Sequence, residues 1–222
     1  ILDENFSKTK DKMNVLVVAV SKKVVDQFIE VFEMVGLEVI DMEIESIAQA
    51  RSVLSNKNDH ETAFLVDIGS RRTSFFASMG NVPCFTSSIP ISNQSLTDAI
   101  AGFFNISTEE AEKIRLNYGI GSMVMNDPVF TAVEPILENL AVEMKKFMDF
   151  YLVGLKYSNS IDRIILCGSG AAVKGIIPYL SNRLGKEVEL GNPWVNLNLG
   201  GELPIIGREE SARYSTSVGL TL

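Results

Sequence analysis

The sequence contains little histidine or cysteine, and this scarcity argues against several kinds of site. The single histidine, His60, lies in the polar stretch SNKNDHET, where we expect a solvated loop side chain and not a general base. The two cysteines, Cys84 and Cys167, are far apart and lie in apolar stretches. We therefore expect two buried thiols, with no disulfide framework and no metal site.

Basic residues and long apolar runs are also scarce. The chain has 20 Lys and Arg against 28 Asp and Glu, a net charge of −8, so it offers no basic stripe for a nucleic acid backbone. No run reaches the roughly 18 apolar residues of a membrane-spanning helix, and the N-terminus lacks the pattern of a signal peptide. We expect a soluble, cytoplasmic protein that does not bind nucleic acid.

Apolar residues make up 46% of the 222 residues, enough for one large or two small packed domains. Near the N-terminus, NVLVVAV indicates a strand, SKKVVDQFIEVFEMVG a helix that ends at Gly36, LEVIDMEI a second strand and ESIAQARSVL a second helix. The polar residues 55–61 follow and form a candidate domain boundary. The pattern predicts a small N-terminal βαβα segment.

The order of elements changes after this linker. TAFLVDIG, TSFFASM and VPCFTSSIPI are β-rich runs separated by short turns, which predicts an antiparallel meander. Two helices follow, LTDAIAGFF and STEEAEKIRLNYG, the second with Ser107 and Glu110 at capping-box spacing. A long helix with an apolar stripe from Val133 to Leu155 comes next.

The last part of the chain contains a buried strand in DRIILCGSG, a helix in AAVKGIIPYLSNRLG, a short strand EVEL and a final helix in GREESARYSTSVGLTL. Three antiparallel strands followed by helix-connected strands predict an α/β fold. The sheet is mixed and five-stranded, with helices on its faces. This order is similar to that of the ribonuclease-H-like fold.

A glycine turn ends the strand in ILCGSGAAVKGI. Gly170 and Gly175 have the spacing of a Walker A loop, but Ile176 occupies the position of its lysine. Val173 stands where a dinucleotide fingerprint has its third glycine. What remains is a strand, a glycine turn and a helix, which either receives a flat ligand close to the backbone or is a tight turn without a ligand.

A second candidate is the hairpin that follows the buried strand FLVDIG. Its turn offers backbone amides and the Ser70 and Thr73 hydroxyls to a phosphate, and Asp67 can hold a hydrated Mg²⁺ beside it. The alternative is that Asp67 caps its own turn. Arg71 and Arg72 are more simply explained as solvated turn residues.

These segments carry a family resemblance. VDIGSRRTSFF, STEEAEKIRLNYG and RIILCGSGAAVKGIIPYLSNRLGKEVELGNPW resemble the second phosphate loop, the ribose-contact helix and the adenosine loop of the actin-like ATPases. Within that superfamily, MNVLVVAVSKKVVDQFIEVFEMVGLEVIDMEIESIAQAR and the ending STSVGLTL most resemble the PilM family of type IV pilus assembly proteins, which is related to FtsA. The resemblance covers nearly the whole chain.

The resemblance implies ATP and Mg²⁺ as cofactors and assigns roles to residues. Two positions depart from the family pattern: Ser169 interrupts the family's glycine triplet, and Arg115 replaces its ribose-contacting lysine. Glu112 and Arg115 could alternatively form an exposed i, i+3 ion pair with no ligand role. The implied contacts are Asp67, Gly69, Ser70 and Thr73 with the β- and γ-phosphates and Mg²⁺, with Asp67 as the metal ligand; Glu112 and Arg115 with the ribose; and Gly168, Ser169, Gly170 and Ala171 with adenosine.

The implied function is an ATP-binding scaffold, without an assigned catalytic residue, peripheral to the inner membrane. It would recruit the N-terminal peptide of a PilN-like membrane protein and contact pilus motor components. Only one Asp-x-Gly hairpin occurs, so we expect a C-terminal, inactive piece: residues 1–57 as the end of a first lobe with part of an inserted subdomain, and 58–222 as the second lobe. An exposed strand edge would favour self-association. An FtsA-like filament former and a small-molecule kinase of the same superfamily remain alternatives.

Overall fold

The computed structural model describes residues 17–55, 62–79, 82–122, 127–154, 161–198 and 206–222. It divides into two compact units, Ile1–Ile44 and Glu45–Leu222, so the second helix groups with the second unit and not with residues 1–44. The expected assignment of residues 1–57 to a first lobe stays a prediction. The elements are α1 (Lys22–Met34), α2 (Glu45–Val53), β1 (Thr62–Ile68), β2 (Thr73–Met79), β3 (Val82–Ile89), α3 (Asn93–Phe104), α4 (Thr108–Tyr118), α5 (Pro128–Asp149), the π-helix η2 (Phe150–Gly154), β4 (Arg163–Cys167), α6 (Ile176–Leu184), β5 (Val188–Leu190), α7 (Arg208–Ser211), the 3₁₀ helix η3 (Ala212–Tyr214) and α8 (Ser215–Gly219).

The first unit contains the predicted helix α1, but the two strands predicted around it are wrong for the residues described. Residues 17–20 and 37–44 have no strand structure, and the start of the first predicted strand lies outside the described residues. A strand needs a neighbour to satisfy its backbone hydrogen bonds, and the described part of this unit supplies none. Helix α1 needs no such neighbour, and Gly36, with φ +74°, follows its end.

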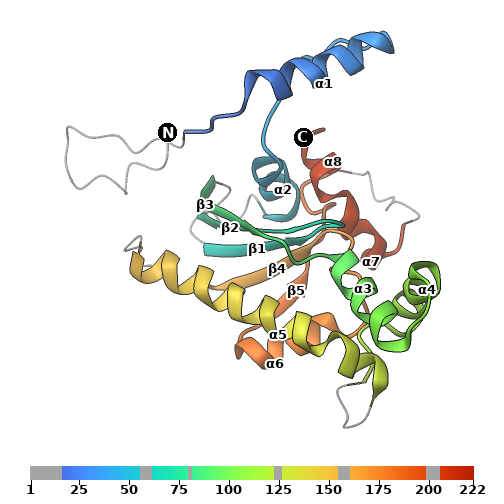
Figure 1. Cartoon of the computed structure of the whole chain (residues 1–222). Helices are drawn as coiled ribbons and strands as arrows, with labels where there is room; N and C mark the ends of the chain where they lie inside the picture. The colour runs from blue at the N-terminus through green and yellow to red at the C-terminus, as the bar shows by residue number, and fades with distance from the viewer. Residues whose placement is uncertain (1–16, 56–61, 80–81, 123–126, 155–160, 199–205) are drawn as a thin grey trace. The chain divides into compact units, whose positions relative to one another are not determined.

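The second unit contains the predicted mixed sheet of five strands, in the order β3-β2-β1-β4-β5 (Figure 1). Strands β1, β2 and β3 form the predicted antiparallel meander. Strand β4 runs parallel to β1, and β5 runs parallel to β4. Because β1 and β4 are parallel neighbours, the turns that leave them emerge at the same end of the sheet.

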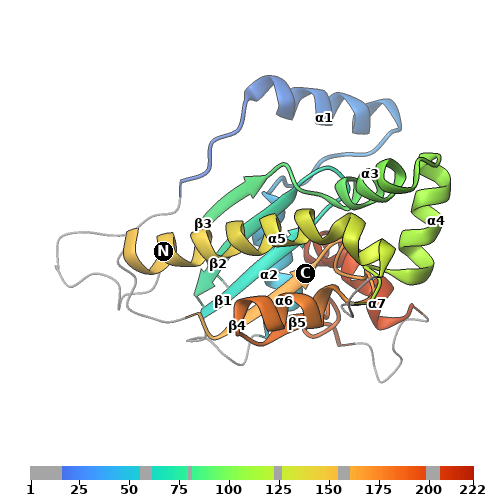
Figure 2. The same cartoon turned by 60° about the horizontal axis from the view of Figure 1, so that its bottom comes forward.

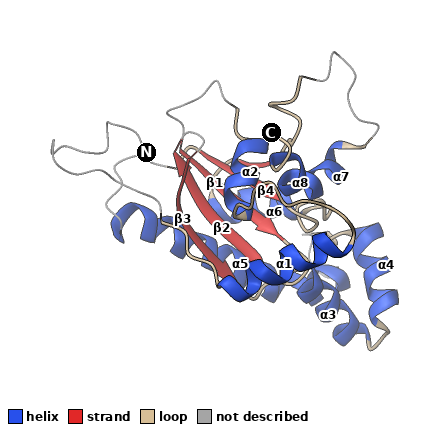
Figure 3. Ribbon diagram, turned by 90° about the horizontal axis from the view of Figure 1, so that it is seen from above, coloured by secondary structure: helices blue, strands red, loops and turns tan. Residues whose placement is uncertain are grey.

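Helices cover both faces of this sheet. Helices α5 and α6 lie on one face, as Figure 2 shows, and α2 and α8 lie on the other, in front of the strands in Figure 3. Side chains of β1 alternate between the two faces: Phe64 and Val66 belong to the large core under α5, and Leu65 packs with residues of α2. This alternation places Asp67 on the face of α2.

The long helix α5 provides much of the larger core. The ring of Phe147 stacks on that of Phe64 with a centroid separation of 4.8 Å, and Met144 is fully buried in the same core. The predicted apolar stripe is therefore confirmed as a packing surface as far as Tyr151, which lies in η2 beyond the end of α5. Leu152 is exposed, and Leu155 lies outside the described residues. Among the helices of the described ranges, none combines the length and apolar character needed to cross a bilayer.

The other helices follow the sequence patterns with two differences. The capping box of α4 is confirmed, since Ser107 Oγ accepts from the Glu110 N–H and Glu110 Oε2 accepts from the Ser107 N–H. Helix α6 begins only at Ile176, so residues 168–175 are turns and not helix. The predicted C-terminal helix is broken into α7, η3 and α8, and the Ala212 carbonyl in this break accepts a hydrogen bond from the Gly168 N–H.

Candidate functional site

The hairpin turn between β1 and β2 lies against the start of helix α3. The Gly69 N–H donates to the Arg72 carbonyl across 2.9 Å, which closes the turn. The Asn93 N–H donates to the Gly69 carbonyl at 2.9 Å, and the Gln94 N–H donates to the Ser70 carbonyl at 3.3 Å. Strand end, turn and helix start therefore form one hydrogen-bonded assembly.

The glycine turn after β4 lies directly on the end of β1. Gly168 has φ +82°, and a Cβ built there would lie 2.1 Å from Asp67 Oδ1. A Cβ on Gly170 would lie 2.2 Å from Ile68 Cγ2, and the Gly170 N–H donates to the Ile68 carbonyl at 2.8 Å. Both glycines are required by this close approach, because any side chain would displace β1.

A pocket of about 470 Å³ opens between these turns, helices α3 and α4, and helix α7. Its volume is within the range typical of small-molecule sites. Acidic and basic side chains both line it, so it suits a polar ligand that carries donors and acceptors. The lining residues are Ser70, Asn93, Gln94, Thr97, Glu112, Arg115, Leu116, Ser169, Ala172, Val173, Lys174, Glu209, Glu210 and Arg213.

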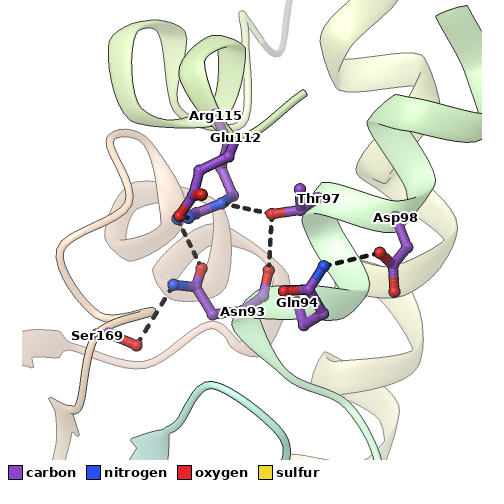
Figure 4. A network of polar contacts seen from close by, with 7 residues as sticks. All are labelled: Asn93, Gln94, Thr97, Asp98, Glu112, Arg115 and Ser169. Carbon is purple, nitrogen blue, oxygen red and sulfur yellow. Dashed lines mark hydrogen bonds and ion pairs between the residues drawn. The ribbon is translucent and has the colours of Figure 1, made fainter. Parts of the chain in front are cut away.

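Arg115 is the centre of a polar network at this pocket (Figure 4). Its side chain is only 6% exposed, and its three nitrogens donate to Thr97 Oγ1 at 2.9 Å, to Asn93 Oδ1 at 2.8 Å and to Glu112 Oε1 at 3.3 Å. Burial lowers the pKa of the guanidinium, the Glu112 carboxylate acts in the opposite direction, and Arg213 lowers it further. Arginine still remains charged at neutral pH, because its ordinary pKa is far higher.

Asp67 lies next to this pocket, at the end of β1. Its Oδ2 accepts a hydrogen bond of 2.6 Å from Gln49 Nε2 of α2. Burial raises the pKa of the Asp67 carboxyl; the bond from Gln49 lowers it, Glu45 raises it and Arg72 lowers it. Among the described residues, Gln49 and not an amide of its own turn is the hydrogen-bond donor to Asp67.

The structure brings four of the predicted site residues into the pocket wall: Ser70, Glu112, Arg115 and Ser169. Because Arg115 is buried, its pair with Glu112 is not the exposed ion pair considered as an alternative. The remaining predicted residues lie in the two turns or at the strand ends that flank them, and they do not line the pocket. They are Asp67, Gly69, Thr73, Gly168, Gly170 and Ala171.

Thr73 is the predicted residue that lies least favourably for a phosphate contact. Its side chain is fully buried, and its hydroxyl donates to the Ile91 carbonyl at 2.8 Å. A phosphate contact would require the hydroxyl to leave this partner. The Ser70 side chain, by contrast, is exposed at the pocket.

Sequence reasoning found four of the fourteen residues that line the pocket and missed the other ten. Asn93 and Thr97 had a usable signal, since they are one helical turn apart at the start of a helix that follows a strand end, where polar side chains favour ligands. Lys174 and the charged residues of α7 and η3 had none, because only the chain's tertiary path brings them here. The missed lining residues with polar side chains are Asn93, Gln94, Thr97, Lys174, Glu209, Glu210 and Arg213.

Within the described ranges, no group of three or more His, Cys, Asp or Glu side chains is placed to hold a metal ion. A Mg²⁺ ion does not require such a group. It is commonly bound by one or two carboxylates together with substrate phosphates and water. Asp67, beside the hairpin turn that carries the exposed Ser70 hydroxyl, supplies one carboxylate of that kind.

Comparison with known proteins gives the family. The family model described as type IV pilus assembly protein PilM matches residues 2–222. The chain belongs to the PilM family. This confirms the family resemblance of the sequence, including its relation to FtsA: the cell division protein FtsA of Pseudomonas aeruginosa is 25% identical, with 84% of this chain and 48% of that protein covered.

Solved structures confirm the actin-like fold. A PilM-PilN type IV pilus biogenesis complex superposes with a TM-score of 0.73 and 23% identity, covering 90% of this chain and 57% of that one. MreB5 of Spiroplasma citri bound to ADP superposes with a TM-score of 0.62 and 15% identity, covering 91% and 65%. The chain thus spans about half the length of the FtsA and PilM relatives that it matches.

Proposed function

We propose that this PilM-family chain forms part of an ATP-binding scaffold for type IV pilus assembly. The observation that carries the nucleotide site is the single pocket that joins Ser70, Glu112, Arg115 and Ser169, which come from three segments far apart in the sequence. The resemblance had implied these same residues for phosphate, ribose and adenosine. A solved relative of the fold is bound to ADP, which supports a nucleotide as the ligand.

The pocket and the two turns beside it match the parts of ATP in a consistent order. The glycine turn at Gly168, which contributes Ser169 to the pocket wall, would take adenosine against its backbone, and Glu112, 56% exposed, would provide a carboxylate acceptor for the ribose hydroxyls. Ser70 and the Gly69 turn face the phosphates, and Asp67 would hold the accompanying Mg²⁺. Bound Mg²⁺ would screen the phosphate charge, while the chain's own residues orient the nucleotide.

Calorimetric titration of Mg-ATP into the full-length protein tests this site. Glu112→Ala should weaken ATP binding about tenfold, because two ribose hydroxyls lose their acceptor. Glu109→Ala is the matched control, since Glu109 is an exposed residue of the same helix outside the pocket. Equal losses in the two variants, or no binding by the unmodified protein, would contradict the assignment.

We propose further that the partner is the N-terminal peptide of a PilN-like membrane protein. The support is the family membership and the similarity to a PilM-PilN complex. In the first unit, α1 exposes apolar side chains on one face, with Phe28 55% and Val31 59% exposed. An apolar helix face of this kind suits an amphipathic or extended peptide. This partner would hold the scaffold at the inner membrane, next to the pilus motor components.

Fluorescence anisotropy with a labelled PilN-type peptide and the full-length protein tests this partner. Phe28→Ala should weaken peptide binding about tenfold, as expected for a buried aromatic contact. Glu30→Ala, on the polar side of α1, should leave the affinity unchanged. Unchanged affinity in Phe28→Ala would place the peptide elsewhere.

An FtsA-like filament former is the alternative function, and light scattering after ATP addition tests it. Ordered filaments seen by electron microscopy would favour this alternative, whereas amorphous aggregates would not.

A further inference from the structure

Asn93 is hydrogen-bonded to all three segments of the proposed nucleotide site. Its backbone N–H donates to the Gly69 carbonyl in the hairpin turn at 2.9 Å. Its side-chain Oδ1 accepts from Arg115 of α4 at 2.8 Å, and its Nδ2 donates to Ser169 Oγ in the glycine turn at 3.3 Å (Figure 4). The side chain is buried, so these contacts define its orientation.

The chemistry of Arg115 decides which way the Asn93 amide faces. A guanidinium has donors and no acceptor, so the amide oxygen of Asn93 must face Arg115. The amide nitrogen then faces Ser169, and the Ser169 oxygen must accept that hydrogen bond. This direction follows from Arg115 and does not depend on telling amide oxygen from nitrogen by position.

A second contact keeps this arrangement in place. Thr97 Oγ1 accepts from Arg115 Nε at 2.9 Å and donates to the Asn93 carbonyl at 3.4 Å. The guanidinium is therefore held on two sides by the same helix, α3. Neither Arg115 nor Asn93 can rotate without breaking a buried hydrogen bond, which is costly.

The contact with Asn93 fixes the hydrogen-bonding role of the Ser169 hydroxyl. Since its oxygen already accepts from Asn93, its hydrogen is available to donate, and Ser169 lines the pocket. Among the described residues, no acceptor takes this hydrogen. We propose that Asn93 is a positioning residue that orients the Ser169 hydroxyl as a donor to an acceptor atom of the bound nucleoside.

This inference rests on the proposed ATP site and adds a residue that the family resemblance did not assign. The decisive variant is Asn93→Asp, which has almost the same shape. The carboxylate still accepts from Arg115, now as an ion pair, so the fold is retained. A carboxylate cannot donate to Ser169, however, so the Ser169 hydroxyl must turn and donate to Asp. The donor to the nucleoside is thereby lost.

The test measures ATP and adenosine binding to the full-length protein and its thermal stability. We expect Asn93→Asp to reduce affinity for both ligands about tenfold, like Ser169→Ala, while the melting temperature is unchanged or higher. Adenosine is included because it has no phosphates. A loss of adenosine affinity in Asn93→Asp therefore cannot come from repulsion between the new carboxylate and phosphates. The double variant Asn93→Asp/Ser169→Ala should lose no more than either single variant. Glu109→Ala, an exposed position on α4 outside the pocket, is the control.

Two outcomes would overturn the inference while leaving the ATP site intact: unchanged adenosine affinity in Asn93→Asp, or additive losses in the double variant. If Asn93→Asp fails to fold, the cycle of Asn93→Ala with Ser169→Ala decides the same point through additivity. Absence of ATP binding by the unmodified protein would overturn the proposed function and this inference together.

Discussion

The side-chain amide of Gln49 donates a hydrogen bond of 2.6 Å to the Asp67 carboxylate. The same nitrogen donates to Thr216 Oγ1 at 2.9 Å, so one glutamine links α2, β1 and α8. Because burial raises the pKa of Asp67, its ionised form is disfavoured in the folded state. Gln49 offsets only part of this cost, so the ionised Asp67 carboxylate makes the folded state less stable than a neutral side chain of the same shape would.

Asp67→Asn should therefore stabilise the protein at neutral pH and weaken Mg²⁺-dependent nucleotide binding. A carboxyl with a raised folded-state pKa contributes stability below its unfolded-state pKa, and this contribution is lost as the pH rises through the folded-state pKa. The Asp67→Asn variant should thus be more stable than the unmodified protein at pH 7 and equally stable near pH 3. Each kcal/mol gained should raise Tm by about 2–4 °C. Thermal melts over this pH range, with Asp98→Asn as the exposed control, test it; a lower Tm at pH 7 would contradict it.

Helices α2 and α8 approach so closely at Gly219 that no side chain fits. A Cβ built on Gly219 would lie 1.8 Å from the Ala48 carbonyl oxygen, which is backbone and cannot move aside. Gly219→Ala should cost about 3 kcal/mol of unfolding free energy. Gly102→Ala is the matched control, because Gly102 is in helix α3 with nothing within 4 Å, and alanine should stabilise there by up to about 1 kcal/mol. Urea unfolding compares the two, and similar effects would refute the close approach.

Asp127 caps the N-terminus of the long helix α5. Its Oδ1 accepts from the Val129 and Phe130 N–H groups, and its Oδ2 accepts from the Ser122 N–H at 2.7 Å. The bonds from Ser122 and Phe130 lower the pKa of its carboxyl. Its stabilisation is therefore present above the unfolded-state pKa of about 3.9 and is lost as the pH falls through the lower folded-state pKa.

Asp127→Ala should accordingly cost about 1 kcal/mol at pH 7 and much less near pH 2. Asp127→Asn, which keeps a capping oxygen, should lose less than alanine at pH 7 and show little dependence on pH. Urea unfolding at several pH values measures both. A pH-independent loss in Asp127→Ala would show that its contribution is not the hydrogen-bonded carboxylate.

Cys167 should be chemically inert in the folded protein. It is fully buried in β4, and burial, followed by the nearby Asp67, raises the pKa of its thiol to about 12, although a bond with Ser215 acts in the opposite direction. The reactive thiolate is therefore nearly absent at pH 8. In a Cys84→Ser background, mass spectrometry should detect no iodoacetamide adduct in buffer and one in concentrated urea. An adduct in buffer would mean that β4 opens readily.

The secondary structure of the second unit was largely predictable, because its signals are local. The apolar run of β1, the stripe of α5 and the capping box at Ser107 each depend on residues within one strand or helix. The strands predicted at residues 14–20 and 37–44 are wrong over the described residues 17–20 and 37–44 for the opposite reason. An apolar run has the composition of a strand, but a strand also requires a partner, which composition does not supply.

The candidate site likewise has features that depend on local sequence and features that depend on tertiary structure. The hairpin after Asp67, the segment Ser107 to Gly119 and the Gly168 turn are short motifs. The sequence alone therefore determined the two strand-end turns, helix α4 and, through their resemblance to a known family, the family and fold. Only the tertiary structure decided that Asn93 contacts Arg115 and Ser169, which are 22 and 76 residues away in the chain. Hydrogen-bond direction depends on which donors meet which acceptors in space, and that pairing exists only once the sheet has brought the distant turns together.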